Sequence, residues 1–126
     1  MGTFIVQGGK PLKGEIIPQG AKNEALQVIC ATLLSPEKIT IHNIPDISDV
    51  NQLIKLVGYL GVMVEKMSAT TYTFEAADIN IANLLTGEGM ALSNSIRGSL
   101  MTAGPLLARF GRAYIPKPGG DKIGRR

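Results

Sequence analysis

The sequence has no tryptophan, one cysteine and one histidine among its 126 residues, and only 5% of the residues are aromatic. Because 44% are nonetheless hydrophobic, the chain can build one core, and that core is aliphatic. The single cysteine, Cys30, excludes an intramolecular disulfide and fits a reducing compartment. It lies in an apolar helical run, which indicates an inert buried thiol.

Long hydrophobic runs are missing as well. The longest apolar stretch without a charge, residues 98–108, is much shorter than the roughly 20 residues that a membrane-spanning helix needs. Residues 2–7 read as a strand without a basic leader, so we expect no signal peptide. The sequence therefore predicts a cytoplasmic protein that does not enter a membrane.

The charge is unevenly distributed. The net charge is +3, but residues 109–126 alone carry +5 and the remainder carries −2. This asymmetry favours a local anion site over general adhesion to nucleic acid or membrane. The only histidine, His42, is expected on the surface of a strand and is weak support for catalysis.

Periodicity and turn residues predict alternating strands and helices. Strands are expected at residues 3–7, 14–18, 38–42, 62–65, 71–75 and 112–116, and residues 78–90 read as a loop. Helices are expected at residues 23–34, from a cap at Ser48 or Asp46 to Gly61, and at 95–110 with a kink or break at Gly104-Pro105. The first helix is apolar almost all round, which predicts packing on several sides.

The last nine residues, 118–126, combine three glycines with several cations and one carboxylate, Asp121. Such a loop suits a multiply charged anion, although taken alone it is more often a solvated basic turn than a site. Its glycine spacing imitates a nucleotide-binding P-loop. That interpretation is poor because Arg125 and Arg126 stand where lysine and a magnesium-binding hydroxyl are needed.

Two further cations stand at corresponding helix starts. Lys22, followed by Asn23, opens the first predicted helix, and Arg97 opens the third, 75 positions later, in a weak internal repeat. An anion placed there gains both the side-chain charge and the helix N-terminus. Taken singly, Lys22 is more often an ordinary solvated lysine and Arg97 a member of a surface ion pair. Together with the basic loop they favour a site.

Four blocks carry a resemblance to a known family: residues 20–26 (GAKNEAL), 96–99 (IRGS), 104–111 (GPLLARFG) and 118–124 (PGGDKIG). In this order they resemble the UDP-N-acetylglucosamine enolpyruvyl transferases of bacterial peptidoglycan synthesis. The resemblance implies an inside-out α/β barrel of two globes, built from βαβαββ repeats with helices inside and sheets outside. Family chains are much longer, so residues 1–21 would belong to the second globe and residues 22–126 to an incomplete catalytic globe.

The resemblance also implies substrates and roles. Lys22 and Asn23 would contact phosphoenolpyruvate, Arg97 would help to bind UDP-N-acetylglucosamine and phosphate, and Arg126 would bind the donor phosphate. Asp121 would be the proton donor. Neither metal nor organic cofactor is implied, and nucleic acid is not an expected partner. The family's general base and a further arginine lie beyond Arg126, so these residues alone would be inactive without the remainder of the chain.

Asp121 departs from the family pattern, because most members have cysteine at this position. Near pH 7 an ordinary thiol is protonated whereas an ordinary aspartate is not. Proton donation therefore requires a raised pKa of Asp121, which burial beside an anionic substrate favours and neighbouring cations oppose. Fosfomycin alkylates the family's thiol, so the substitution predicts resistance to this epoxide.

Two other functions stay open at this point. One is the related enolpyruvyl-shikimate-phosphate synthase activity, which shares the fold and the donor, although residues 118–121 and the Lys22-Asn23 pair argue against it. The other is a non-enzymatic anion- or RNA-binding module that uses the basic tail. Its weakness is that only Phe110 and Tyr114 are available there for stacking on bases.

Overall fold

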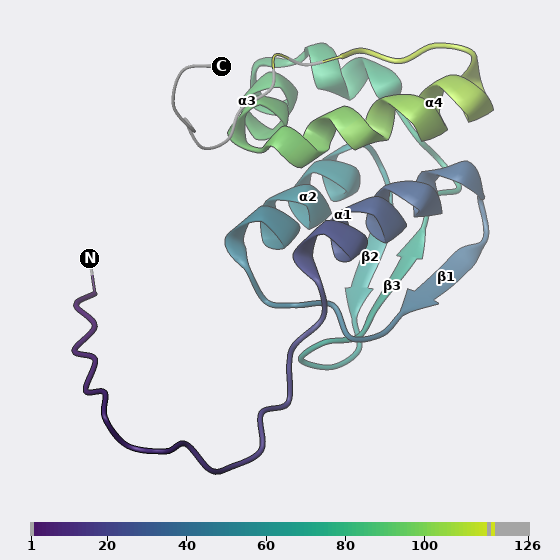
Figure 1. Ribbon diagram of the computed structural model, residues 1–126. Coiled ribbons are helices and arrows are strands. Elements are labelled where there is room, and N and C mark those ends of the chain that lie inside the picture. The colour runs from purple at the N-terminus through teal and green to yellow at the C-terminus, as the bar shows by residue number, and fades with distance from the viewer. Residues whose placement is uncertain (1, 116, 118–126) are drawn as a thin grey trace.

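The computed structural model describes residues 2–115 and 117. In chain order the elements are α1 (Lys22–Ala31), η1 (Thr32–Leu34), β1 (Lys38–Ile41), α2 (Ser48–Tyr59), β2 (Met63–Lys66), β3 (Tyr72–Glu75), η2 (Ile81–Leu85), α3 (Gly87–Ser95), η3 (Arg97–Thr102) and α4 (Ala103–Phe110), where η denotes a 3₁₀ helix. Figure 1 shows three layers, with α1 and α2 between the three-stranded sheet and a layer that contains α3 and α4. The chain is therefore a mixed helix-and-strand fold.

The sheet has the order β1-β3-β2, and both outer strands run antiparallel to β3. β2 and β3 form the hairpin predicted from the sequence, and β1 also lies where a strand is expected. Phe74 of β3 pairs with Ile39 on one side and Val64 on the other, and it is fully buried. On the opposite face Lys38 and Glu65 form an exposed ion pair of 3.8 Å. The sheet thus turns one apolar face to the helices and one polar face to solvent.

Helix α1 confirms the first predicted helix, with its last turn tightened into η1. It packs against both α2 and η3, while Val28 on its outer side is 39% exposed. The expectation of packing on several sides is therefore confirmed in part: the helix contacts more than one element but keeps one exposed side. Cys30 lies on the buried side, where burial raises the pKa of its thiol to about 12. The thiol is thus protonated at neutral pH and inaccessible, as expected for an inert cysteine.

Helix α2 confirms the second predicted helix and its buried apolar stripe. It ends before Gly61, whose φ of 112° lies in the left-handed region that favours glycine. Its start differs from the prediction. Asp46 accepts a hydrogen bond from Asn51 Nδ2 at 2.7 Å, and Ser48 is already helical, so neither residue caps the helix.

The third predicted helix, residues 95–110, is divided into η3 and α4, which confirms the expected break. The α-helical part begins at Ala103, so Gly104 and Pro105 lie in its first turn instead of at the break itself. Proline is tolerated there because the first N–H groups of a helix have no intrahelical acceptor.

The loop predicted for residues 78–90 is wrong, because this region contains η2 and the start of α3. Thr86 Oγ1 accepts a hydrogen bond from the Gly89 N–H at 3.0 Å and so caps α3. Any side chain at Gly89 would clash with the Asn83 carbonyl oxygen. The glycine that suggests a loop is therefore required by the close packing of α3 on η2.

Three predicted strands do not form within the described residues. Residues 3–7 and 14–18 belong to an extended tail that leaves the body of the molecule (Figure 1), where Phe4 is 93% and Leu12 100% exposed. Residues 112–115 are also irregular. A strand is stabilised only by pairing with another strand, and no described strand pairs with these segments.

Arg109 joins the layers. Its Nη1 donates hydrogen bonds to the carbonyl oxygens of Leu33 at 3.1 Å and Ala76 at 2.7 Å, and its guanidinium lies 4.9 Å from the centre of the Phe110 ring. These contacts tie α4 to the end of η1 and to the residue that follows β3. Arg109 is therefore a structural residue, although the sequence counts it among the cations of the basic C-terminal segment.

Candidate functional site

The first turns of α1, α2 and η3 meet at a cavity of about 260 Å³. Its lining residues are Lys22, Asn23, Leu26, Asp49, Arg97, Gly98, Leu100 and Met101. Helix α1 packs against both α2 and η3, and this brings residues distant in sequence to one place. The structure thus unites Lys22, Asn23 and Arg97, the described residues that the sequence singles out for ligand binding. Their individual roles stay predictions.

The cavity carries two cations and one carboxylate. Lys22 Nζ lies 3.0 Å from Asp49 Oδ2, and these side chains are 49% and 48% exposed. Arg97 is exposed as well. Leu26 and Met101 supply apolar wall. A small anion bound here would therefore meet an excess of positive charge next to a partly dry surface.

The backbone at this place also suits an anion. Neither Ala21 before α1 nor Ile96 before η3 supplies a side-chain hydrogen bond to the helix start. By contrast, Asn80 and Thr86 cap η2 and α3 with their side chains. The first N–H groups of an uncapped helix lack an acceptor and can donate to a bound anion.

Two glycines set the positions of α1 and η3. A Cβ on Gly98 would lie 3.2 Å from Leu26 Cδ1, so its absence lets η3 approach α1 closely. A Cβ on Gly20, just before α1, would clash with the carbonyl oxygen of Asn43, which has a φ of 59°. Close backbone packing at both points therefore fixes where Lys22 begins its helix.

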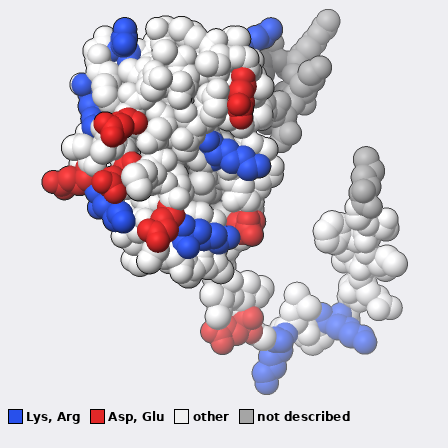
Figure 2. Space-filling view, turned by 180° about the vertical axis from the view of Figure 1, so that it is seen from behind, with Lys and Arg blue, Asp and Glu red and all other residues white. Residues whose placement is uncertain are grey.

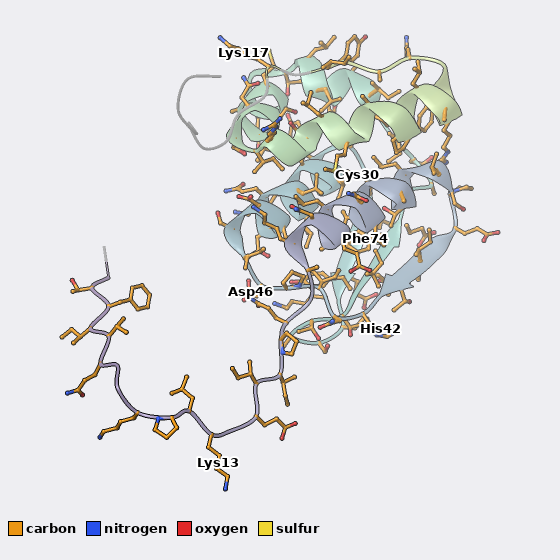
Figure 3. The ribbon with its side chains drawn as sticks, in the orientation of Figure 1. Lys13, Cys30, His42, Asp46, Phe74 and Lys117 are labelled. Carbon is orange, nitrogen blue, oxygen red and sulfur yellow. The ribbon has the colours of Figure 1, made fainter. Side chains whose placement is uncertain are left out.

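Other candidate residues lie apart from this cavity. Lys117 lines a separate, mostly apolar cavity of about 210 Å³ with Tyr114 and Ile115. His42 is exposed, as expected, and its Nδ1 lies 3.2 Å from Thr71 Oγ1. Figure 3 shows Lys117 and His42 at opposite ends of the body of the molecule.

Asp121 and Arg126, predicted as proton donor and phosphate ligand, lie outside the described residues, as do Lys122 and Arg125. Within the part that the structure describes, no cluster of three histidine, cysteine or acidic side chains could hold a metal ion. In the same part, every helix is too short or too polar to cross a membrane. On the face seen in Figure 2, basic and acidic side chains are interspersed and do not form one continuous basic area.

Comparison with known proteins identifies the family of this chain. A profile of the family described as EPSP synthase (3-phosphoshikimate 1-carboxyvinyltransferase) matches residues 6–126. The chain belongs to this family.

Several curated relatives of the chain carry a different name. Proteins named UDP-N-acetylglucosamine 1-carboxyvinyltransferase from Bacteroides fragilis and Bacteroides thetaiotaomicron are each 55% identical over all 126 residues, and the one from Porphyromonas gingivalis is 49% identical. The chain spans 29% of the length of these curated relatives.

Sequence reasoning missed Asp49 as a member of the site. An acidic residue in the first turn of a predicted helix is ordinarily explained by the helix dipole. Its partner, Lys22, is 27 positions away, and only the packing of α1 on α2 brings the two side chains together. No local signal in the sequence indicates that contact.

The glycine packing can be tested with a matched pair of substitutions in the full-length protein. Gly20→Ala places a Cβ against the Asn43 carbonyl, whereas a Cβ at Gly58 in α2 meets nothing within 4 Å. We expect Gly20→Ala to lower the free energy of unfolding by about 1–3 kcal/mol. Gly58→Ala should leave it unchanged or raise it by up to about 1 kcal/mol. Urea denaturation measures both, and equal effects would contradict the proposed close approach.

Proposed function

We propose that the longer protein containing this chain transfers the enolpyruvyl group of phosphoenolpyruvate to the 3′-hydroxyl of UDP-N-acetylglucosamine and releases inorganic phosphate. The observation that carries the proposal is the cavity shared by Lys22, Asn23 and Arg97, because phosphoenolpyruvate carries both a phosphate and a carboxylate. The names of relatives at 49–55% identity support this choice of acceptor. The reaction would be the first committed step of peptidoglycan synthesis.

In this proposal Lys22 and Asn23 contact phosphoenolpyruvate, and Arg97 helps to hold the nucleotide sugar and the phosphate. The sugar hydroxyl attacks C2 of the donor while C3 takes up a proton, which gives a tetrahedral intermediate. Loss of a proton from C3 and of inorganic phosphate from C2 then restores the double bond. Fixed cations hold both acidic groups of the donor in place throughout these steps.

Two residues outside the described part complete the proposed site. Asp121 would donate the proton to C3, and Arg126 would bind the donor phosphate, both by likeness to the family motif. The general base and a further donor-binding arginine would come from the rest of the longer protein. We therefore propose that these 126 residues alone do not turn over.

We propose that the longer protein has the inside-out α/β barrel architecture of the family. We also propose that it is located in the cytoplasm. Residues 1–21 would pair into the second globe, and residues 22–126 would form the first part of the catalytic globe. The exposure of Ile5 (94%) and Ile16 (90%) supports this division, because such side chains need a partner surface outside the described body.

The acceptor is tested by phosphate release from phosphoenolpyruvate, using the full-length protein with UDP-N-acetylglucosamine or with 3-phosphoshikimate. We expect release only with the nucleotide sugar. Lys22→Met should lower kcat/KM by about 100-fold or more, since it removes a charge that holds the donor. Lys55→Met, at an exposed position of α2, is the matched control and should change little.

Phosphate release with 3-phosphoshikimate alone would show that this compound, and not UDP-N-acetylglucosamine, is the acceptor. Failure with both acceptors, together with salt-sensitive binding to single-stranded RNA, would favour the anion-binding module.

Fosfomycin provides an independent test of the cysteine-to-aspartate difference. The one thiol of this chain, Cys30, is 2% exposed, and burial raises its pKa to about 12. We therefore expect peptide mass spectrometry of the drug-treated full-length protein to find no adduct in residues 1–126, and its activity to persist. A covalent adduct at Asp121 with loss of activity would refute the proposed resistance.

A further inference from the structure

Asp49 is the only acidic residue that lines the Lys22 cavity among the described residues. Its Oδ2 lies 3.0 Å from Lys22 Nζ, and both side chains are about half exposed (48% and 49%). At this exposure an ion pair contributes little to stability. Any larger contribution of this pair would therefore come from the position in which it holds the lysine.

The position of Asp49 is consistent with that role. Asp49 lies in the first turn of α2, yet no side chain caps this helix start, so the carboxylate is not engaged as a cap. It reaches across to α1 instead, where its ion pair with Lys22 Nζ restricts the end of a long side chain. A lysine ordered before its ligand arrives loses less conformational entropy on binding.

A second ion pair shows that this arrangement is not a general surface feature. Lys38 and Glu65 lie on the solvent face of the sheet, are separated by 3.8 Å, and line neither the cavity at Lys22 nor the cavity at Lys117. The Lys22–Asp49 pair is shorter and borders a cavity that also contains Arg97. An anion entering this cavity would reach both cations and would compete with Asp49 for the lysine.

We propose that Asp49 is a positioning residue: it holds the Lys22 ammonium at the edge of the cavity and yields it to an acidic group of phosphoenolpyruvate. The inference rests on the proposed function. It also makes a directional prediction, because Asp49 is negatively charged and by charge alone would repel the donor.

The test compares variants of the full-length enzyme in the phosphate-release assay. Asp49→Asn should lower kcat/KM for phosphoenolpyruvate about tenfold, while its urea midpoint stays within error of the wild type. Asp49→Glu should recover part of the loss. In the Lys22→Met background, Asp49→Asn should cause no further loss, because a residue that acts only through Lys22 has nothing left to position. Glu65→Gln, which breaks the Lys38–Glu65 ion pair, should leave kcat and KM unchanged.

The contrary outcomes are distinct. A rise in kcat/KM on Asp49→Asn would mean that the carboxylate only repels the donor. If Asp49→Asn lowers kcat/KM as much in the Lys22→Met background as in the wild type, or lowers the urea midpoint, Asp49 stabilises the fold and does not act through Lys22. Either result overturns the positioning role. Inactivity of the wild type with UDP-N-acetylglucosamine would instead refute the proposed function.

Discussion

The arrangement of the site depends on the close packing of α1 against η3. Gly98 has no side chain to separate the two elements, and Leu26 fills the space that a Cβ would enter. Since Lys22 and Arg97 open these elements, their packing brings together two cations that are 75 positions apart. The proposed binding of one anion by both cations follows from that contact. Side-chain chemistry alone, without this geometry, would leave two unrelated surface cations.

Much of the body of the molecule is predictable from local patterns. The apolar stripe of α2, the hairpin of β2 and β3, and the break before α4 follow from periodicity and from the known behaviour of glycine and proline. That Lys22 and Arg97 line one cavity is also anticipated, because a repeat and a family resemblance point to the same residues. These features share a property: each is encoded either within a few residues or by a recurring motif.

The remaining features depend on contacts that the sequence does not display. The expected strands at residues 3–7 and 14–18 lack partners in the described part of the chain, and a strand pattern without a partner does not make a sheet. Gly89 suggests a loop but is required by packing on Asn83. In the sequence Asp49 is an ordinary acidic residue at a helix start, and only the packing of α1 on α2 brings it to Lys22.

The most direct measurement is a crystal structure of the full-length protein with phosphoenolpyruvate and UDP-N-acetylglucosamine bound. The account predicts that Lys22 Nζ and the Arg97 guanidinium each lie within about 3 Å of an acidic group of a bound substrate, with Lys22 shifted away from Asp49. Substrates bound elsewhere, with the Lys22–Asp49 pair intact beside an empty cavity, would contradict it.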